Sequence, residues 1–214
     1  MQNTLDLSFS HALRTNISAN VAAFDDRRHV ADPATPLKHA AVAITIIRHA
    51  DAGAVIVTKR APGLRDHGGQ WALPGGRLDA FETAIDAARR ELQEEVNLDL
   101  GISTVLGTLD DYVTRSGYVI TPVVLWSDIE DTDLQPNPGE VASIHAFTFS
   151  ELLRRDSPNL EVIAESDRQV LSMNYLDDRI YAPTAAMLYQ FREVALCGLH
   201  TRVNHFDQPV FAWR

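Results

Sequence analysis

The chain has 214 residues, of which 45% are hydrophobic and 22% are charged, so it can bury one sizeable core. Its formal net charge of −10 argues against broad nucleic-acid binding, which needs a basic surface. No apolar run approaches the roughly 20 residues that span a bilayer, and no targeting signal is evident, so we expect no membrane segment. The single cysteine, Cys197, excludes an internal disulfide and favours the reducing cytoplasm; we expect its side chain to be buried on a helix.

The first part of the chain predicts one helix and two strands. Between Ser8 and Arg28, apolar residues recur at helical spacing, and the proline-containing segment 31–39 ends the pattern. The apolar runs 40–47 and 54–60 then predict two core strands, and the residues Ala50-Asp51-Ala52-Gly53 between them predict a tight turn.

A glycine-rich loop, residues 61–76, leads into a second helix that we expect to run from about Ala80 to Val96. Two β-rich runs, 104–115 and 118–128, predict a long hairpin, and 140–153 predicts a strand that runs into a helix. The last helix is expected over 184–196, followed by an irregular tail. Strands with helices on both sides predict an α/β fold, an α/β/α sandwich around a mixed β-sheet.

The second predicted helix carries three closely spaced glutamates. Glu91, Glu94 and Glu95 fall within one arc of roughly 100°, where like charges repel. Arg90 can reach Glu94 one turn on, but one arginine does not neutralise three glutamates. Hard oxygen ligands on a rigid element suit Mg²⁺ or Mn²⁺. The alternative is a solvated acidic face without a metal.

The spacing of polar residues around this helix resembles a known signature. Gly76, Glu82, Arg90-Glu91, Glu94-Glu95 and Leu98 stand at the intervals of the Nudix hydrolase pattern G-x5-E-x7-R-E-U-x-E-E-x-G-U, where U is apolar. The departure is Asn97 in place of glycine. Asn tolerates the left-handed conformation that ends helices, so this change is mild.

The resemblance implies a metal-dependent hydrolase that cleaves a diphosphate, with Mg²⁺ or Mn²⁺ as cofactor. It makes Glu91, Glu94 and Glu95 metal ligands and Glu91 the first candidate to activate water. Glu82 either contacts a metal through water or caps the helix, as in a capping box with Asp79. Arg90 would orient the carboxylates, and Gly75 and Gly76 would let the loop approach the metal.

The loop before the helix is similar to the coenzyme A diphosphatase branch of that family, L-L-T-x-R-[SA]-x3-R-x3-G-x3-F-P-G-G. The matching residues are Thr58, Arg60, Ala61, Arg65, Gly69, Pro74, Gly75 and Gly76, and Leu73 replaces the phenylalanine. Arg60 and Arg65, with Lys59 or His67, are the candidate phosphate-binding residues, unless they are ordinary surface charges. Glu140 is a rival base, or else a loop carboxylate.

We therefore expect hydrolysis of coenzyme A or acyl-CoA to 3′,5′-ADP and (acyl-)4′-phosphopantetheine. The alternatives are a diphosphatase for ADP-ribose, NADH or dinucleoside polyphosphates, and a non-catalytic nucleotide-sensing domain. The expected division is an N-terminal helical extension (1–37), a hydrolase domain (38–200, signature 76–98) and a C-terminal tail (201–214). The partner is a small nucleotide rather than nucleic acid or membrane, and the terminal segments either form a homodimer or close the core of a monomer.

Overall fold

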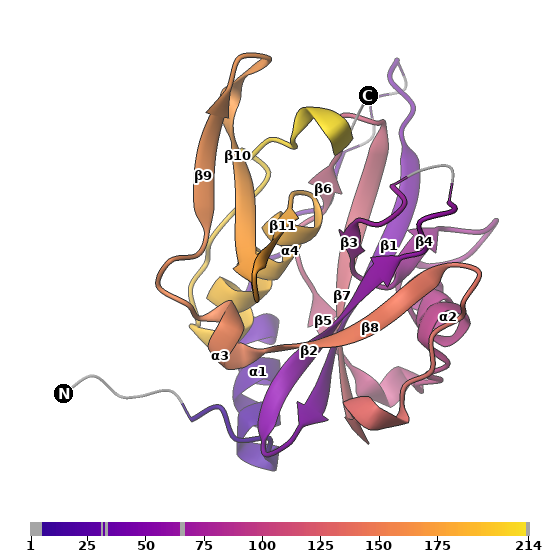
Figure 1. Cartoon of the computed structure of the whole chain (residues 1–214), viewed down its shortest axis with the longest axis vertical. Coiled ribbons are helices and arrows are strands. Elements are labelled where there is room, and N and C mark those ends of the chain that lie inside the picture. Colours follow the sequence, from indigo (N-terminus) through magenta and orange to yellow (C-terminus); the bar gives the residue numbers. More distant parts are fainter. Residues whose placement is uncertain (1–5, 31, 33, 65–66, 213–214) are drawn as a thin grey trace.

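Among the residues that the structure describes, the main sheet has eight strands and is mixed, as predicted. The computed structural model describes residues 6–30, 32, 34–64 and 67–212 (Figure 1). The central order is β3-β2-β1-β7-β5; β4 pairs with β1, β6 with β7 and β8 with β2. β1 and β7 run parallel and the other neighbours antiparallel. The strands are β1 Lys38–His49, β2 Ala52–Arg60, β3 Trp71–Ala72, β4 Gly75–Arg77, β5 Val105–Thr108, β6 Tyr112–Val113, β7 Tyr118–Glu130 and β8 Val141–Thr148.

Helices cover both faces of this sheet, because alternate residues of the central strands are apolar on each side. On one face, Ala41 and Ala43 of β1 pack against α2 (Ala84–Val96). On the other face, Val42 and Ile44 share a core with α1 (His11–Ala23) and α4 (Thr184–Phe191). The remaining helical segments are α3 Phe149–Leu152, the π-helix η3 Arg192–Leu196 and the 3-10 turns η1 Ile102–Thr104, η2 Asp131–Asp133 and η4 Val210–Ala212.

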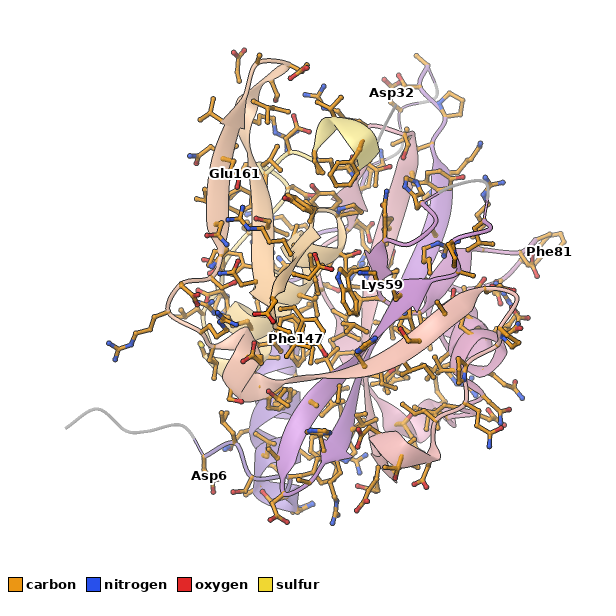
Figure 2. All side chains as sticks on the ribbon, viewed as in Figure 1. Asp6, Asp32, Lys59, Phe81, Phe147 and Glu161 are labelled. Carbon is orange, nitrogen blue, oxygen red and sulfur yellow. The ribbon has the colours of Figure 1, made fainter. Side chains whose placement is uncertain are left out.

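A second, three-stranded antiparallel sheet was not predicted. Its order is β11-β10-β9, with β9 Asn159–Ile163, β10 Ser166–Tyr175 and β11 Asp178–Tyr181. It joins the main sheet through Tyr175, whose ring lies 5.0 Å from that of Trp71. Figure 2 shows Lys59 of β2 between the two sheets. The C-terminal part of the chain therefore packs against β3 and forms one wall of the space beside that strand.

The first helix is shorter than the predicted span of 8–28. Ser10 caps it by accepting a hydrogen bond from the Leu13 backbone N–H, and Phe24 is extended and ends it. Cys197 is exposed just after the π-helix, so the expectation of a buried thiol was wrong. Within the described residues, no helix is both long and apolar enough to cross a membrane.

Candidate active site

The acidic helix begins four residues later than predicted. Phe81 has a φ of 69°, in the left-handed region that a right-handed helix cannot include. The side chain of Phe81 projects away from the fold (Figure 2). Thr83 then caps α2 by accepting a hydrogen bond from the Asp86 N–H. At the other end Asn97 is left-handed, with a φ of 56°, as its identity predicted.

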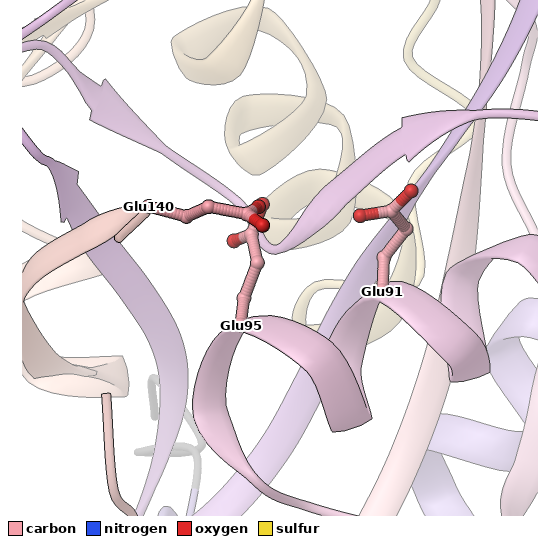
Figure 3. Close-up of side chains that lie close together, drawn as sticks. All are labelled: Glu91, Glu95 and Glu140. Carbon is pink, nitrogen blue, oxygen red and sulfur yellow. The ribbon is translucent and has the colours of Figure 1, made fainter. Parts of the chain in front are cut away.

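Three carboxylates from two elements meet beside this helix (Figure 3). Glu91 and Glu95 lie one turn apart on α2, and Glu140 precedes β8. One oxygen from each lies within 4.8 Å of the others. Among the described residues this is the one group of acidic, histidine or cysteine side chains with metal-binding geometry.

Backbone hydrogen bonds hold Glu140 in that position. The Asn137 N–H donates to the Glu95 carbonyl oxygen at 2.9 Å, which fixes the loop against the end of α2. The Ala61 N–H donates to the Glu140 carbonyl oxygen at 2.8 Å, next to a bulge in the pairing of β2 with β8. Glu140 thus reaches the helix through strand pairing rather than through proximity in sequence.

The three carboxylates of this cluster repel one another. Glu95 is only 2% exposed, and burial, with the charges of Glu91 and Glu140 adding to it, raises its pKa to about 8. Burial also raises the pKa of Glu91, although Arg90 opposes the shift. Arg60 is the cation that opposes the shift of Glu95. Such a group of oxygen ligands fits a divalent cation, which would offset their mutual repulsion.

Arg90 is hydrogen-bonded to three glutamates in and just before α2. It donates to both oxygens of Glu82 at 2.9 and 3.0 Å, to Glu91 at 2.7 Å and to Glu94 at 3.0 Å. It also donates to the Arg77 carbonyl oxygen at 3.0 Å, which ties β4 to α2. Arg90 lowers the pKa of Glu82. Glu82 and Glu94 are therefore partners of Arg90 here and lie outside the three-carboxylate group.

Glycine is required at the turn before the helix. A Cβ at Gly76 would lie 2.6 Å from the Glu91 Cδ atom, and one at Gly75 would lie 2.7 Å from the Val42 Cγ1 atom. Both distances are too short for a side chain. The two glycines pair with β1 in the sheet, so the backbone itself passes directly beside the carboxylates.

A cavity of about 600 Å³ opens beside this turn. Its cationic lining residues are Lys38, Arg60 and Arg77, and none of the described residues that line it is acidic. Trp71, Tyr118 and Phe211 add aromatic surface. The Arg60 Nε atom is buried with no hydrogen-bond partner among the described residues. An anionic ligand would supply that partner.

Only some of the predicted phosphate-binding residues line this cavity. Arg60, Gly75, Gly76 and the exposed His67 line the cavity. Lys59 instead donates to Asp178 at 2.9 Å and lies 4.5 Å from the Trp71 ring centroid, outside this cavity. Arg65 lies outside the described residues. Sequence reasoning missed Lys38 and Arg77, although Arg77 directly follows the signature glycine.

A mixed sheet, a glycine turn and carboxylates clustered at the following helix form a candidate metal-binding site next to a cation-lined cavity. The NUDIX domain model matches residues 37–170. The chain is 34% identical over 159 residues to the Nudix hydrolase NudL of Photorhabdus laumondii, itself described as uncharacterized, covering 73% of this chain and 84% of that protein. It is 42% identical over 165 residues to NudL of Escherichia coli O6:H1, covering 74% and 82%. The MutT protein of Methanosarcina mazei Go1 superposes with a TM-score of 0.46 at 17% identity, covering 57% of this chain and 84% of that one.

The chain belongs to the Nudix hydrolase family, whose members hydrolyse diphosphate bonds. Enzymes of this family typically use a divalent metal, and their substrates are nucleotide-like small molecules. The protein is thus a Nudix diphosphate hydrolase with an acidic cluster suited to such an ion.

Proposed function

We propose that this enzyme hydrolyses the diphosphate bond of coenzyme A or acyl-CoA to 3′,5′-ADP and (acyl-)4′-phosphopantetheine. The observation that carries the proposal is the position of Arg60 in the loop of Thr58 to Gly76. This residue matches the coenzyme A diphosphatase pattern, and it lines the cavity next to the carboxylates with an unpaired, buried Nε atom. A guanidinium group with a free donor is well suited to a phosphate oxygen.

The acidic cluster suits Mg²⁺ or Mn²⁺, held by Glu91, Glu95 and Glu140, with Glu94 and Glu82 as outer candidates. When bound, a divalent ion screens the phosphate oxygens and polarises the attacking water. Glu91 and Glu140 are the two candidates to accept the proton of that water. Arg90 orients Glu91 through its 2.7 Å hydrogen bond. Gly75 and Gly76 keep side chains out of the space that the diphosphate needs.

A substrate panel tests the proposal. The purified protein, with millimolar Mn²⁺ or Mg²⁺, is incubated with coenzyme A, acetyl-CoA, ADP-ribose, NADH and a dinucleoside polyphosphate. We expect the highest kcat/KM for coenzyme A or its acyl form, with 3′,5′-ADP as product, and loss of activity in excess EDTA. Faster turnover of ADP-ribose or NADH would reject coenzyme A as substrate and retain the diphosphatase chemistry.

A non-catalytic sensor would bind a member of the panel and hydrolyse none. The complete set of carboxylates argues against this, because nucleotide binding alone does not require a group that activates water. The division of the chain at residues 37 and 200, a homodimer and a cytoplasmic location remain predictions. Analytical ultracentrifugation decides the second of these.

A further inference from the structure

Two cations of the cavity lack an acidic partner. Lys38 and Arg77 are both exposed, and no ion pair with a carboxylate is found for either among the described residues. Lys38 Nζ lies 5.5 Å and Arg77 Cζ 5.3 Å from the centroid of the Tyr118 ring. Arg77 also donates a hydrogen bond to the Tyr118 hydroxyl. The ring therefore brings two positive charges together in a chain whose net charge is −10.

Strand pairing places this pair on the cavity side of the sheet. Lys38 is opposite Tyr118 in the register of β1 with β7, and Ala40 is opposite Arg77 in that of β1 with β4. Because residues two apart on a strand share a face, Lys38, Tyr118 and Arg77 share the face of Ala40. Gly76, one residue earlier, is opposite Ala41 and meets Glu91 on the α2 side.

The carboxylates near Glu91 and the cation pair of Lys38 and Arg77 therefore lie on opposite faces of a single strand, β4. A diphosphate that reacts at the carboxylates would lie beside Gly76, and the Arg77 side chain is on the opposite face of that strand. The cation pair is therefore available for a different anionic group of the same nucleotide. A phosphomonoester carries between one and two negative charges at neutral pH, which two cations can match.

We infer that Lys38 and Arg77, held together by Tyr118, bind a phosphomonoester of the substrate, the 3′-phosphate of coenzyme A. This inference rests on the proposed function, because coenzyme A carries such a group one ribose away from its diphosphate, whereas ADP-ribose and NADH do not. Ser116 also lines this cavity, and its hydroxyl is hydrogen-bonded to that of Thr114. Lys38 and Arg77 thereby determine specificity and leave the chemistry to the carboxylates.

The test compares coenzyme A with 3′-dephospho-coenzyme A in the wild type and in Lys38→Met and Arg77→Met. The wild type is expected to favour coenzyme A by roughly 10- to 100-fold in kcat/KM, through KM, as charge-assisted hydrogen bonds allow. Each variant loses about tenfold or more on coenzyme A and little on the dephospho form. Arg155→Met removes an exposed arginine that does not line the cavity and leaves both values unchanged.

An equal loss on both substrates would assign the cations to the diphosphate and overturn the inference, as would a wild type that does not distinguish the two. Lys38→Arg, which keeps the charge, restores the preference and guards against a variant that folds poorly. If coenzyme A is not hydrolysed at all, the proposed function fails, and calorimetric binding of 3′,5′-ADP against 5′-AMP decides the inference alone. Tighter binding of 3′,5′-ADP that Lys38→Met abolishes supports the site; equal binding rejects it.

Discussion

The two sides of β4 carry opposite charge. On the α2 side, Glu91, Glu95 and Glu140 crowd together, and burial raises the pKa of Glu95 to about 8. On the cavity side, Lys38 and Arg77 gather around Tyr118 with no acidic residue among the described lining. Each face of the strand therefore carries an excess of one charge. A metal ion would neutralise the carboxylates, and a phosphate group would neutralise the two cations. Because β4 is only three residues long and begins with Gly75 and Gly76, one short strand presents the carboxylates on one face and the cations on the other.

The largest effect is expected on the acidic side. Glu91→Gln keeps an oxygen that accepts the Arg90 hydrogen bond but removes the negative charge and the capacity to take a proton. We expect kcat to fall by roughly 10²- to 10⁴-fold, the usual contribution of a general base. The melting temperature in EDTA should stay close to that of the wild type, because one of several repelling charges is lost.

Steady-state kinetics at saturating Mn²⁺ measure this effect, with Glu140→Gln as the matched variant. The variant with the larger fall in kcat identifies the base. If Glu91→Gln retains full activity, the base is Glu140 or a group outside this cluster.

An intermediate effect is expected at the strand between the two sides. Gly76→Ala puts a Cβ within 2.6 Å of the Glu91 Cδ atom, so the carboxylate or the strand must move. We expect the free energy of unfolding to fall by about 1–3 kcal/mol, as overpacking usually costs, and kcat/KM to fall by about tenfold or more. Urea unfolding and kinetics measure the two changes.

The control is Gly101→Ala, because a Cβ there would meet its nearest atom, the Ser103 Oγ, at 3.8 Å. This variant should match the wild type in both measurements. Full activity in Gly76→Ala would mean that the backbone need not approach Glu91 so closely for catalysis.

The sequence predicted the acidic side better than the basic side, for a physical reason. Glu91 and Glu95 share a helix, so their spacing alone places them together. Lys38 and Arg77 meet through the pairing of β1 with β4 and β7, which is long-range and has no spacing rule. Glu140 was named only as a rival base, because its place beside Glu95 depends on the pairing of β8 with β2.

In the fold, too, the sequence predicted some elements correctly and missed others. The mixed sheet and its helices followed from apolar runs that are buried on both faces, such as β1 and β2. The second sheet was missed because β9 is largely exposed and shows no such pattern. The start of α2 was misplaced since the left-handed φ of Phe81 has no signal in the residue type.

The smallest effect concerns the chain's other lysine in this region, which is already neutralised. Lys59 donates to Asp178, and Lys59 and Trp71 together lower the pKa of Asp178 to about 2. Asp178→Asn keeps an acceptor for the Trp71 indole N–H and removes the ion pair. Because the pair is about half exposed, we expect the free energy of unfolding at pH 7 to fall by less than about 1 kcal/mol.

The pH dependence of that difference gives the sharper test. The folded pKa lies below the ordinary 3.8, so the unfolded chain takes up the proton first as the pH falls. The contribution of Asp178 is therefore complete above about pH 4 and is lost as the pH falls towards 2. Urea unfolding followed by tryptophan fluorescence should show the stabilities of wild type and variant converging as the pH falls from about 4 towards 2. A difference that stays constant over that range would mean that the ion pair between Lys59 and Asp178 does not stabilise the fold. Lys59 would then not be neutralised by Asp178, and the contrast with Lys38, which has no acidic partner among the described residues, would fail.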